Sequence, residues 1–421
     1  MLTLLMLVVA AVAQAYPIDA YPETGIKRLE FYRLAQLGEI RGRQLPAGGK
    51  LGVDDIELNY PVLPVDAAGH VQLPQRDVLL SRRISDLLAA EDLPRYGIAV
   101  LDYSDPDNPV YASHNDDFHS NVGSVGKMIV GVAVMQQLAD IYPNDIEARR
   151  RILRDTRIVA DEYSNYDHHE VPLFDVAARD LDYRKLRVGD EGNLWEWLDW
   201  MFSASSNAAA SMVVQQATLL NHFGRDYPAG VQAHQDWLEQ TSHHDEGAVT
   251  VDALTHGLTA NGFDTNLIRQ GSYFTRGGKR AAAGVTSYAT PRELVRLLAM
   301  MEAGTLVDDW SSLELKRLLY MTQRRIRYAS HPALHDSAVY FKSGSLYGCK
   351  PEPDFVCQKY KGNRINILGS VAIIESPADD PQLKYAVAVV SNVLYKNSAV
   401  AHQTLAMRIH RLLESIHGEA R

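Results

Sequence analysis

A chain of 421 residues has room for one large domain with extensions or for two moderate ones. With 46% hydrophobic and 22% charged residues, it has the composition of a globular protein with a sizeable core. Its net charge of -10 argues against a nucleic-acid partner, which would require a basic surface.

The beginning of the chain carries the pattern of a secretory signal. An apolar run from Leu2 to Val12 ends in Ala13-Gln14-Ala15, a small-residue pattern typical of a cleavage site. The run is too short to span a bilayer as a stable anchor. We therefore expect residues 1–15 to be a signal peptide. The mature protein should be exported, periplasmic or secreted, without a transmembrane anchor.

The rest of the chain predicts a mixed α/β fold. Residues 16–80 carry no chemical motif and are interpreted as an N-terminal extension. Apolar residues recur at helical or strand spacing in the segments that follow, with helices at 79–90, 128–141, 291–301 and 398–416 and strands at 96–103, 110–112, 338–341, 365–374 and 385–393. We expect one domain at 81–421, built on a five-stranded antiparallel sheet from both chain ends and flanked by helices. An all-helical subdomain, at about 125–330, is inserted in it.

The first chemical motif, Ser124-Val125-Gly126-Lys127, lies where a loop becomes the helix at 128–141. That helix is apolar on nearly every face, which indicates burial. A serine there lies in the field of free helical N–H groups, and a lysine three residues later can reach its hydroxyl. Lysine acts as a base only if its pKa falls from about 10.4 to about 7, through burial and a neighbouring cation such as Lys342. The alternative is a helix-capping serine with an exposed lysine.

The second motif is Ser205-Ser206-Asn207, a polar group of residues between two apolar helical stretches. A loop at this point can project into a cleft. There a hydroxyl can relay a proton to a leaving group and an amide can hold a substrate carbonyl. The alternative is a serine-rich turn between helices.

The third motif, Lys342-Ser343-Gly344-Ser345, follows the strand at 338–341 and is expected to end it. A strand edge offers backbone groups to an extended substrate, and Lys342 adds a fixed positive charge for a carboxylate. Gly344 allows close approach of the backbone. The N–H groups of Ser345 and Ser124 are candidates for an oxyanion hole. The alternative is an edge strand with a solvent-facing lysine.

Cysteine and histidine give weaker signals. In an oxidising compartment Cys349 and Cys357 can close a small disulfide loop, and the alternative is two unpaired thiols. Zinc is less expected, because two cysteines without nearby histidines leave the metal short of ligands. The histidine-acid clusters at 167–170 and 243–246 lack the i, i+4 spacing of the known zinc motif, so we interpret both as polar insertion loops. No metal and no cofactor is expected.

In chain order the three motifs match S-x-x-K, S-x-N and K-[ST]-G. From about residue 80 to the C-terminus the chain resembles the class A β-lactamase and penicillin-binding-protein superfamily of serine hydrolases. The stretch 286–298 also resembles the helix that follows the Ω-loop of class A enzymes. The resemblance implies that Ser124 is the acylated nucleophile, Lys127 the base or proton relay, and Ser205 a proton shuttle. It also implies that Asn207 binds the acyl-side amide and that Lys342 and Ser343 hold a carboxylate.

Two departures from the family pattern bear on the reaction. Ser206 replaces the aspartate in the middle of the second motif, and an insertion is expected at 142–187. The Ω-loop glutamate that activates the deacylating water has no clear counterpart, because the segment 266–286 contains no Asp or Glu. Glu239 and Glu246 lie further upstream. General-base help is worth about 10²–10⁴ in rate, so acylation is expected while efficient deacylation is in doubt.

The sequence thus predicts an exported serine hydrolase that forms an acyl-enzyme on Ser124 with a β-lactam or a D-alanyl or other peptide amide. The alternative is a non-catalytic module that senses or binds cell-wall peptide. Both give a small molecule or a cell-wall peptide as the partner, and we expect a monomer.

Overall fold

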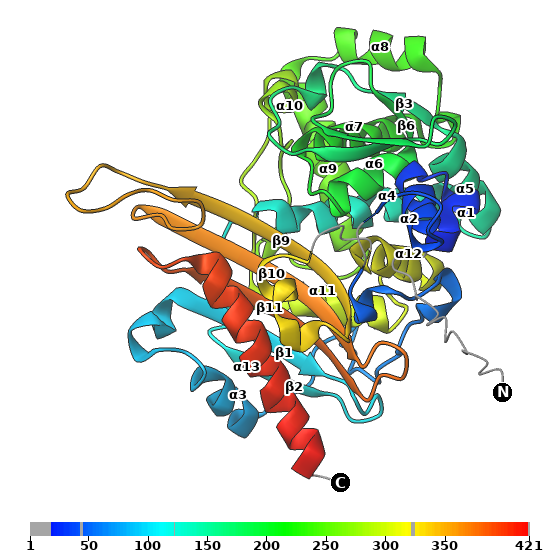
Figure 1. Ribbon diagram of the computed structural model, residues 1–421. Coiled ribbons are helices and arrows are strands. Elements are labelled where there is room, and N and C mark those ends of the chain that lie inside the picture. Colours follow the sequence, from blue (N-terminus) through cyan, green and yellow to red (C-terminus); the bar gives the residue numbers. More distant parts are fainter. Residues whose placement is uncertain (1–17, 43–44, 122, 321–324, 420–421) are drawn as a thin grey trace, which may run out of the picture.

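The computed structural model describes residues 18–42, 45–121, 123–320 and 325–419 (Figure 1). The expected signal peptide at 1–15 lies outside the described residues. Among the described helices, none is long and apolar enough to cross a membrane.

The predicted antiparallel sheet is confirmed, with five strands in the order β2-β1-β11-β10-β9. Strands β1 and β2 come from the early part of the chain, and β9, β10 and β11 from the late part (Tyr96–Asp102, Val110–His114, Ala338–Gly348, Ile365–Ser376 and Leu383–Asn392). The two parts meet where β1 pairs with β11, with Tyr96 opposite Ser391. Strand β9 lies at the edge of the sheet and pairs with β10 along one side.

Helices cover both faces of the sheet, as its strand sequences require. Along β1, Ile98 and Val100 pack on one face with α3 (Val78–Ser85) and α13 (Ser398–Glu419). Ala99 and Leu101 point to the other face, where α11 (Pro291–Glu302) lies. The alternation follows from the period of two in a strand, and burial on both faces explains why β1 is apolar at nearly every position. Helix α13 crosses the first face in Figure 1.

The inserted region is mostly helical. The buried helix α4 (Lys127–Ile141) packs against α7 (Asn207–Phe223) and α9 (His243–Thr259), which explains its apolar character on every side. Around them lie α5, α6, α8, α10 and α12 (Ile146–Asp155, Leu194–Phe202, Val231–Gln240, Arg276–Ala281 and Asp309–Tyr320).

The expectation of an all-helical insertion needs one correction. The region also holds three short antiparallel pairs, β3 with β6, β4 with β5, and β7 with β8 (Arg157–Val159, Glu191–Asn193, Val171–Asp175, Asp180–Arg184, Ile268–Arg269 and Tyr288–Ala289). These strands have two to five residues, too few for the periodicity of a strand to be recognised in the sequence.

The segment that precedes the sheet packs onto the inserted helical region. Helices α1 (Tyr21–Thr24) and α2 (Lys27–Gln36) lie beside α5 and α6 in Figure 1. Arg28 on α2 binds Asp199 on α6 through two N–O contacts of 2.5 Å, and both side chains are buried. Ile26 and Leu29 join the same apolar core as the inserted helices. Helices α1 and α2 are therefore packed against the body of the protein.

Candidate active site

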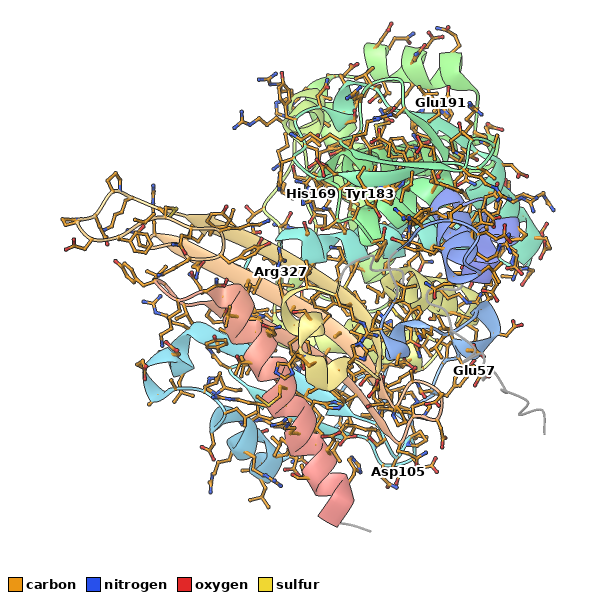
Figure 2. All side chains as sticks on the ribbon, viewed as in Figure 1. Glu57, Asp105, His169, Tyr183, Glu191 and Arg327 are labelled. Carbon is orange, nitrogen blue, oxygen red and sulfur yellow. A yellow bond between two sulfur atoms is a disulfide. The ribbon has the colours of Figure 1, made fainter. Side chains whose placement is uncertain are left out.

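The three sequence motifs meet in one cleft between the free edge of β9 and the inserted helical region. The cleft has a volume of about 660 Å³. Ser124, Ser205, Asn207, Lys342, Ser343 and Ser345 all line it. His169 and Arg327, labelled in Figure 2, mark its two sides.

The first motif places a buried amine beside the hydroxyl of Ser124. Ser124 lies in a 3-10 turn, Gly123–Gly126, and Lys127 is the first residue of α4. The Nζ atom of Lys127 is 3.1 Å from Ser124 Oγ, 2.6 Å from the Ser205 carbonyl oxygen and 2.8 Å from Asn207 Oδ1. The alternative of an exposed lysine is wrong, because Lys127 is 0% exposed. Burial lowers its pKa to about 7, although Asp167 opposes the shift.

The second motif turns sharply between α6 and α7. Ser205 adopts a left-handed backbone with φ of 57°, a conformation that costs a residue with a Cβ about 1–3 kcal/mol and is common at functional sites. Its Oγ accepts a hydrogen bond of 2.8 Å from Lys342 Nζ and lies 3.5 Å from Lys127 Nζ. Ser206 caps α7, with its Oγ accepting from the N–H of Ala209. The motif is therefore both a helix cap, at Ser206, and a cleft wall, at Ser205 and Asn207.

The third motif lies inside β9, which continues to Gly348 and does not end at residue 341 as expected. The expectation of a strand edge at Lys342 is confirmed, but that of a solvent-facing lysine is not, since Lys342 is 3% exposed. Burial lowers the pKa of Lys342 well below its ordinary value, and repulsion from Lys127 and Arg327 adds to the effect. A Cβ at Gly123, where φ is 50°, would lie 3.4 Å from the Ser345 nitrogen, so the turn that holds Ser124 lies against β9.

Arg327 is a member of the cleft that the sequence did not indicate. It opens the 3-10 turn Arg327–Ser330, and its guanidinium donates to Ser343 Oγ at 2.7 Å and to Ser345 Oγ at 3.2 Å. It also donates to the hydroxyl of Tyr360 at 2.9 Å. No motif surrounds Arg327, and only the folded chain brings it to β9.

Residues 167–170 form a polar loop of the insertion, as predicted, but the Asp167 side chain is only 2% exposed and the loop contributes to the cleft. The Asp167 carboxylate accepts hydrogen bonds from Ser206 Oγ at 2.8 Å and from the N–H groups of Asn207 and Ala208 at 2.7 and 2.9 Å. Asp167 thus supplies, from a separate loop, a carboxylate to the second motif, where Ser206 stands in place of the family's aspartate. His169 lines the cleft, with Nδ1 2.7 Å from Asp167 Oδ1.

The expectation of a polar loop is wrong for the second histidine-acid cluster. Residues 243–246 begin α9, and the Glu246 carboxylate is buried between the hydroxyls of Tyr163 and Tyr273. Glu239 lies on α8 with its side chain exposed and does not line the cleft. Neither Glu239 nor Glu246 is therefore part of this site.

The acid-free segment 266–286 brings an aromatic ring to the site. Lys127 Nζ lies 5.0 Å from the ring centre of Phe274, whose backbone N–H is held by Ser211 Oγ at 3.1 Å. A ring at this position excludes water from the amine and accepts no proton. The segment therefore contributes to the burial of Lys127 and supplies no base.

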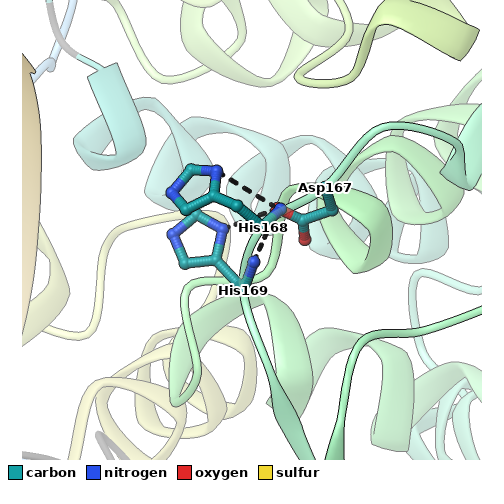
Figure 3. Close-up of side chains that lie close together, drawn as sticks. All are labelled: Asp167, His168 and His169. Atoms are coloured by element: carbon teal, nitrogen blue, oxygen red, sulfur yellow. Dashed lines mark hydrogen bonds and ion pairs between the residues drawn. The ribbon is translucent and has the colours of Figure 1, made fainter.

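Among the described residues, Asp167, His168 and His169 offer ligand atoms close enough together for a metal ion (Figure 3). The two Asp167 oxygens already accept six hydrogen bonds between them, from Ser206, Asn207, Ala208, the N–H groups of both histidines and His169 Nδ1. A carboxylate with about four acceptor sites has none left for a cation. The donor set does not fit a metal.

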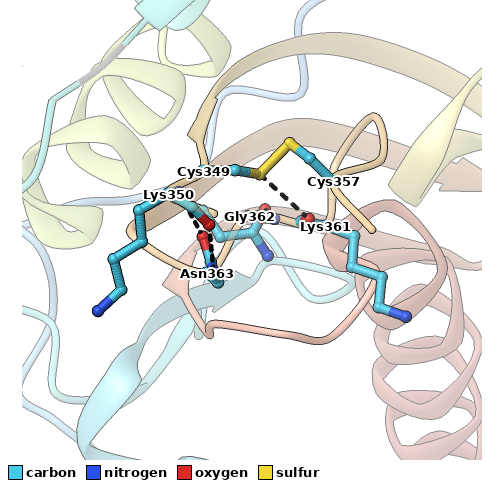
Figure 4. The surroundings of a disulfide bond; sticks show 7 residues. Cys349, Lys350, Cys357, Lys361, Gly362 and Asn363 are labelled. Carbon is cyan, nitrogen blue, oxygen red and sulfur yellow. Dashed lines mark hydrogen bonds between the residues drawn. A yellow bond between two sulfur atoms is a disulfide. The ribbon is translucent and has the colours of Figure 1, made fainter. Parts of the chain in front are cut away.

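Cys349 and Cys357 form the disulfide predicted from the sequence, in the loop between β9 and β10 (Figure 4). The base of this loop is closed by Asn363, whose side-chain amide exchanges two hydrogen bonds of 2.9 Å with the backbone of Lys350. The end of the loop carries Tyr360, which lines the cleft beside Arg327. The disulfide therefore closes a ring at 349–357 within the same β9–β10 connection that brings Tyr360 to the cleft.

Comparison with known families agrees with this geometry. The family model described as "Beta-lactamase enzyme family" matches residues 79–403, more than half of the chain. The chain belongs to the beta-lactamase enzyme family. Helices α1 and α2 lie outside the matched range, so the family pattern does not account for the N-terminal segment.

Solved structures show the same fold at low sequence identity. The TLA-3 extended-spectrum beta-lactamase is 16% identical, with a TM-score of 0.52 over 80% of this chain and 98% of that one. A variant of the class A beta-lactamase of the last common ancestor of Gram-negative bacteria is 18% identical, with a TM-score of 0.50 over 81% of this chain and 100% of that one. Comparison with curated proteins gave no match.

Proposed function

We propose that this member of the beta-lactamase enzyme family is a serine hydrolase that is acylated on Ser124 by a β-lactam or by a D-alanyl or other peptide amide. The observation that carries the proposal is the position of Lys127. Its amine is fully buried, has a pKa lowered to about 7 and lies 3.1 Å from Ser124 Oγ. A serine hydroxyl becomes an effective nucleophile when a base of this kind can take its proton.

In the acylation step, the neutral Lys127 amine takes the proton of the Ser124 hydroxyl. Two N–H groups of that amine donate to the Ser205 carbonyl oxygen and to Asn207 Oδ1, which leaves its lone pair for Ser124. Ser124 Oγ then bonds to the substrate carbonyl carbon, and the carbonyl oxygen takes the negative charge. The N–H groups of Ser124 and Ser345 are our candidates for stabilising it, and the loss of one such donor costs about 10²–10³ in rate.

Ser205 is positioned to return the proton to the leaving nitrogen. Its hydroxyl lies between the two amines, 3.5 Å from Lys127 Nζ and 2.8 Å from Lys342 Nζ. A proton that passes from Lys127 through Ser205 Oγ to the substrate nitrogen allows the carbon–nitrogen bond to break. Asn207 uses Oδ1 for Lys127, so its amide N–H groups are left to hold the acyl-side carbonyl of the substrate.

The cationic end of the cleft is suited to a substrate carboxylate. Arg327, Ser343 and Lys342 lie side by side along β9, with Arg327 Nη1 2.7 Å from Ser343 Oγ. A guanidinium binds carboxylates with two parallel hydrogen bonds. We assign the carboxylate to Arg327 and Ser343, with Lys342 as a further positive charge once substrate is bound.

We also propose that the protein acts after export. The apolar run at 2–12 with its small-residue end and the Cys349–Cys357 disulfide support this, because disulfides persist in oxidising compartments.

A fluorescent penicillin tests the proposed acylation. The wild-type protein should take a covalent label that survives denaturation, because the acyl group is esterified to Ser124. Ser124→Ala should take none, and Ser415→Ala, on α13 outside the cleft, should label as the wild type does. A non-catalytic binding module would instead bind penicillin reversibly in both the wild type and Ser124→Ala. The absence of any covalent adduct on folded wild-type protein would contradict the proposal.

A further inference from the structure

The acyl-enzyme on Ser124 needs a base to activate water, and the segment expected to carry it offers Phe274 in place of a carboxylate. Another candidate base, His169, lines the same cleft as Ser124. His169 is 24% exposed at its side chain, so its ring is accessible from the cleft.

Asp167 holds the His169 ring in one orientation. Its carboxylate is 2% exposed and fixed by the backbone N–H groups that begin α7. His169 Nδ1 lies 2.7 Å from Asp167 Oδ1 (Figure 3). Because an ionised carboxylate accepts hydrogen bonds and does not donate them, Nδ1 carries the proton and Nε2 carries the lone pair. Within the described chain, Nε2 has no hydrogen-bond partner.

We propose that His169, oriented by Asp167, is the general base that activates water to hydrolyse the acyl-enzyme, an inference that rests on the proposed acylation of Ser124. His169 Nε2 takes a proton from water while the water oxygen bonds to the acyl carbon. The ester bond to Ser124 Oγ then breaks, the proton on His169 returns to Ser124 Oγ by way of the neutral Lys127 amine, and the acid product leaves. The balance is one water consumed for each ester bond broken.

The surroundings of Asp167 and His169 keep the carboxylate ionised and the imidazole neutral, which are the forms that this step requires. Burial alone would raise the pKa of Asp167, but hydrogen bonds from His169 and the N–H of Ala208 lower it, so the carboxylate is ionised. Burial lowers the pKa of His169 from 6.5, and the charges of Lys127 and His168 add to this, while Asp167 opposes it. His169 is therefore a neutral base at pH 7. Glu170 is the remaining titratable group of the loop that lines the cleft.

Intact-mass spectrometry with benzylpenicillin separates the two half-reactions. The rate at which the adduct forms measures acylation, and its loss after free penicillin is removed measures deacylation. His169→Ala should acylate at close to the wild-type rate and lose the adduct about 10²–10⁴ times more slowly, which is the usual worth of a general base. Retained acylation also shows that the variant is folded.

His256→Ala is the matched control. His256 lies on α9 with Nε2 2.6 Å from Asp140 Oδ2, so the variant also breaks a histidine–carboxylate pair, but one that does not line the cleft. It should acylate and deacylate as the wild type does. The role of His169 would be overturned if His169→Ala deacylated at the wild-type rate. It would also be overturned if Glu170→Gln kept its adduct for a long time and His169→Ala did not. Neither result would affect the proposed acylation. A wild-type adduct that is never hydrolysed would also overturn the role of His169 and leave the proposed acylation intact. Failure of the wild type to form any adduct would overturn both proposals.

The pH dependence distinguishes a base from a structural residue. Wild-type deacylation should slow as the pH falls through a value below 6.5, where His169 gains a proton, and His169→Ala should lack this acid limb. Asp167 raises the pKa of His169, so Asp167→Asn should move the limb to lower pH. An unchanged limb in His169→Ala would overturn the proposal.

Discussion

The cleft gathers positive side chains in a protein whose net charge is -10. Lys127, Lys342 and Arg327 surround the space beside Ser124, and the ionised Asp167 carboxylate lies near Lys127. Burial lowers the pKa values of both lysines, and repulsion from Lys127 and Arg327 lowers that of Lys342 further. The lysines of the empty cleft therefore give up a proton more readily than ordinary lysines, and a carboxylate that enters the cleft favours their protonated, positively charged form.

The pH dependence of acylation follows from Lys127. Its pKa is about 7, so the fraction of neutral amine grows as the pH rises through that value. The second-order rate of labelling by a fluorescent penicillin should rise from pH 5 and level off above about pH 8. Lys127→Ala should lose about 10²–10⁴ of the rate and the pH dependence with it. A wild-type profile that is flat over this range would contradict a base at Lys127.

Arg327 should discriminate between substrates with and without a carboxylate. Arg327→Ala removes a charge-assisted pair worth about 1.5–3 kcal/mol, so acylation by a penicillin should fall about 10–100-fold. The methyl ester of the same penicillin should be affected little, since it has no carboxylate to lose. Arg82→Ala, exposed on α3, is the matched control and should treat both compounds as the wild type does. An equal loss for acid and ester would contradict the assignment.

At the scale of elements, the site depends on how α7 begins. Ser206 caps the helix, Asp167 binds its first N–H groups, and Ser205 takes its left-handed conformation directly before it. The same few residues thus fix the helix and direct Ser205 and Asn207 into the cleft. Helix α6 leads into this turn, and Arg28 of α2 binds Asp199 of α6.

The contact between α2 and α6 supports a stability prediction. Arg28→Ala leaves Asp199, which is 0% exposed, as a buried charge without its guanidinium, and such losses cost about 3–5 kcal/mol. Arg33→Ala on the same helix is the control, because its ion pair with Glu30 is only partly buried and such pairs near the surface are worth about 1 kcal/mol or less. Urea unfolding compares the two. Equal destabilisation by both variants would contradict the importance of the buried pair.

At the scale of the whole molecule, the sequence predicted what depends on local pattern. The strands of the sheet, the buried helix after Ser124 and the three motifs were all recognisable because their residues are close in the chain. Asp167 and Arg327 were not, since each acts on residues that only folding brings near. Asp167 binds Asn207, which is 40 positions away, and Arg28 binds Asp199, which is 171 positions away. The periodicity of apolar residues along the sequence does not predict contacts between residues so far apart.

The pairing of β1 with β11 also sets the order of events during synthesis. Residues 96–102 emerge early, but their central partner at 383–392 and the covering helix α13 are made last. Until then the early strands have β2 beside β1 and an open edge, and long-range pairing of this kind is slow to form. The sheet therefore cannot be completed until residues 383–392 and helix α13 have been made.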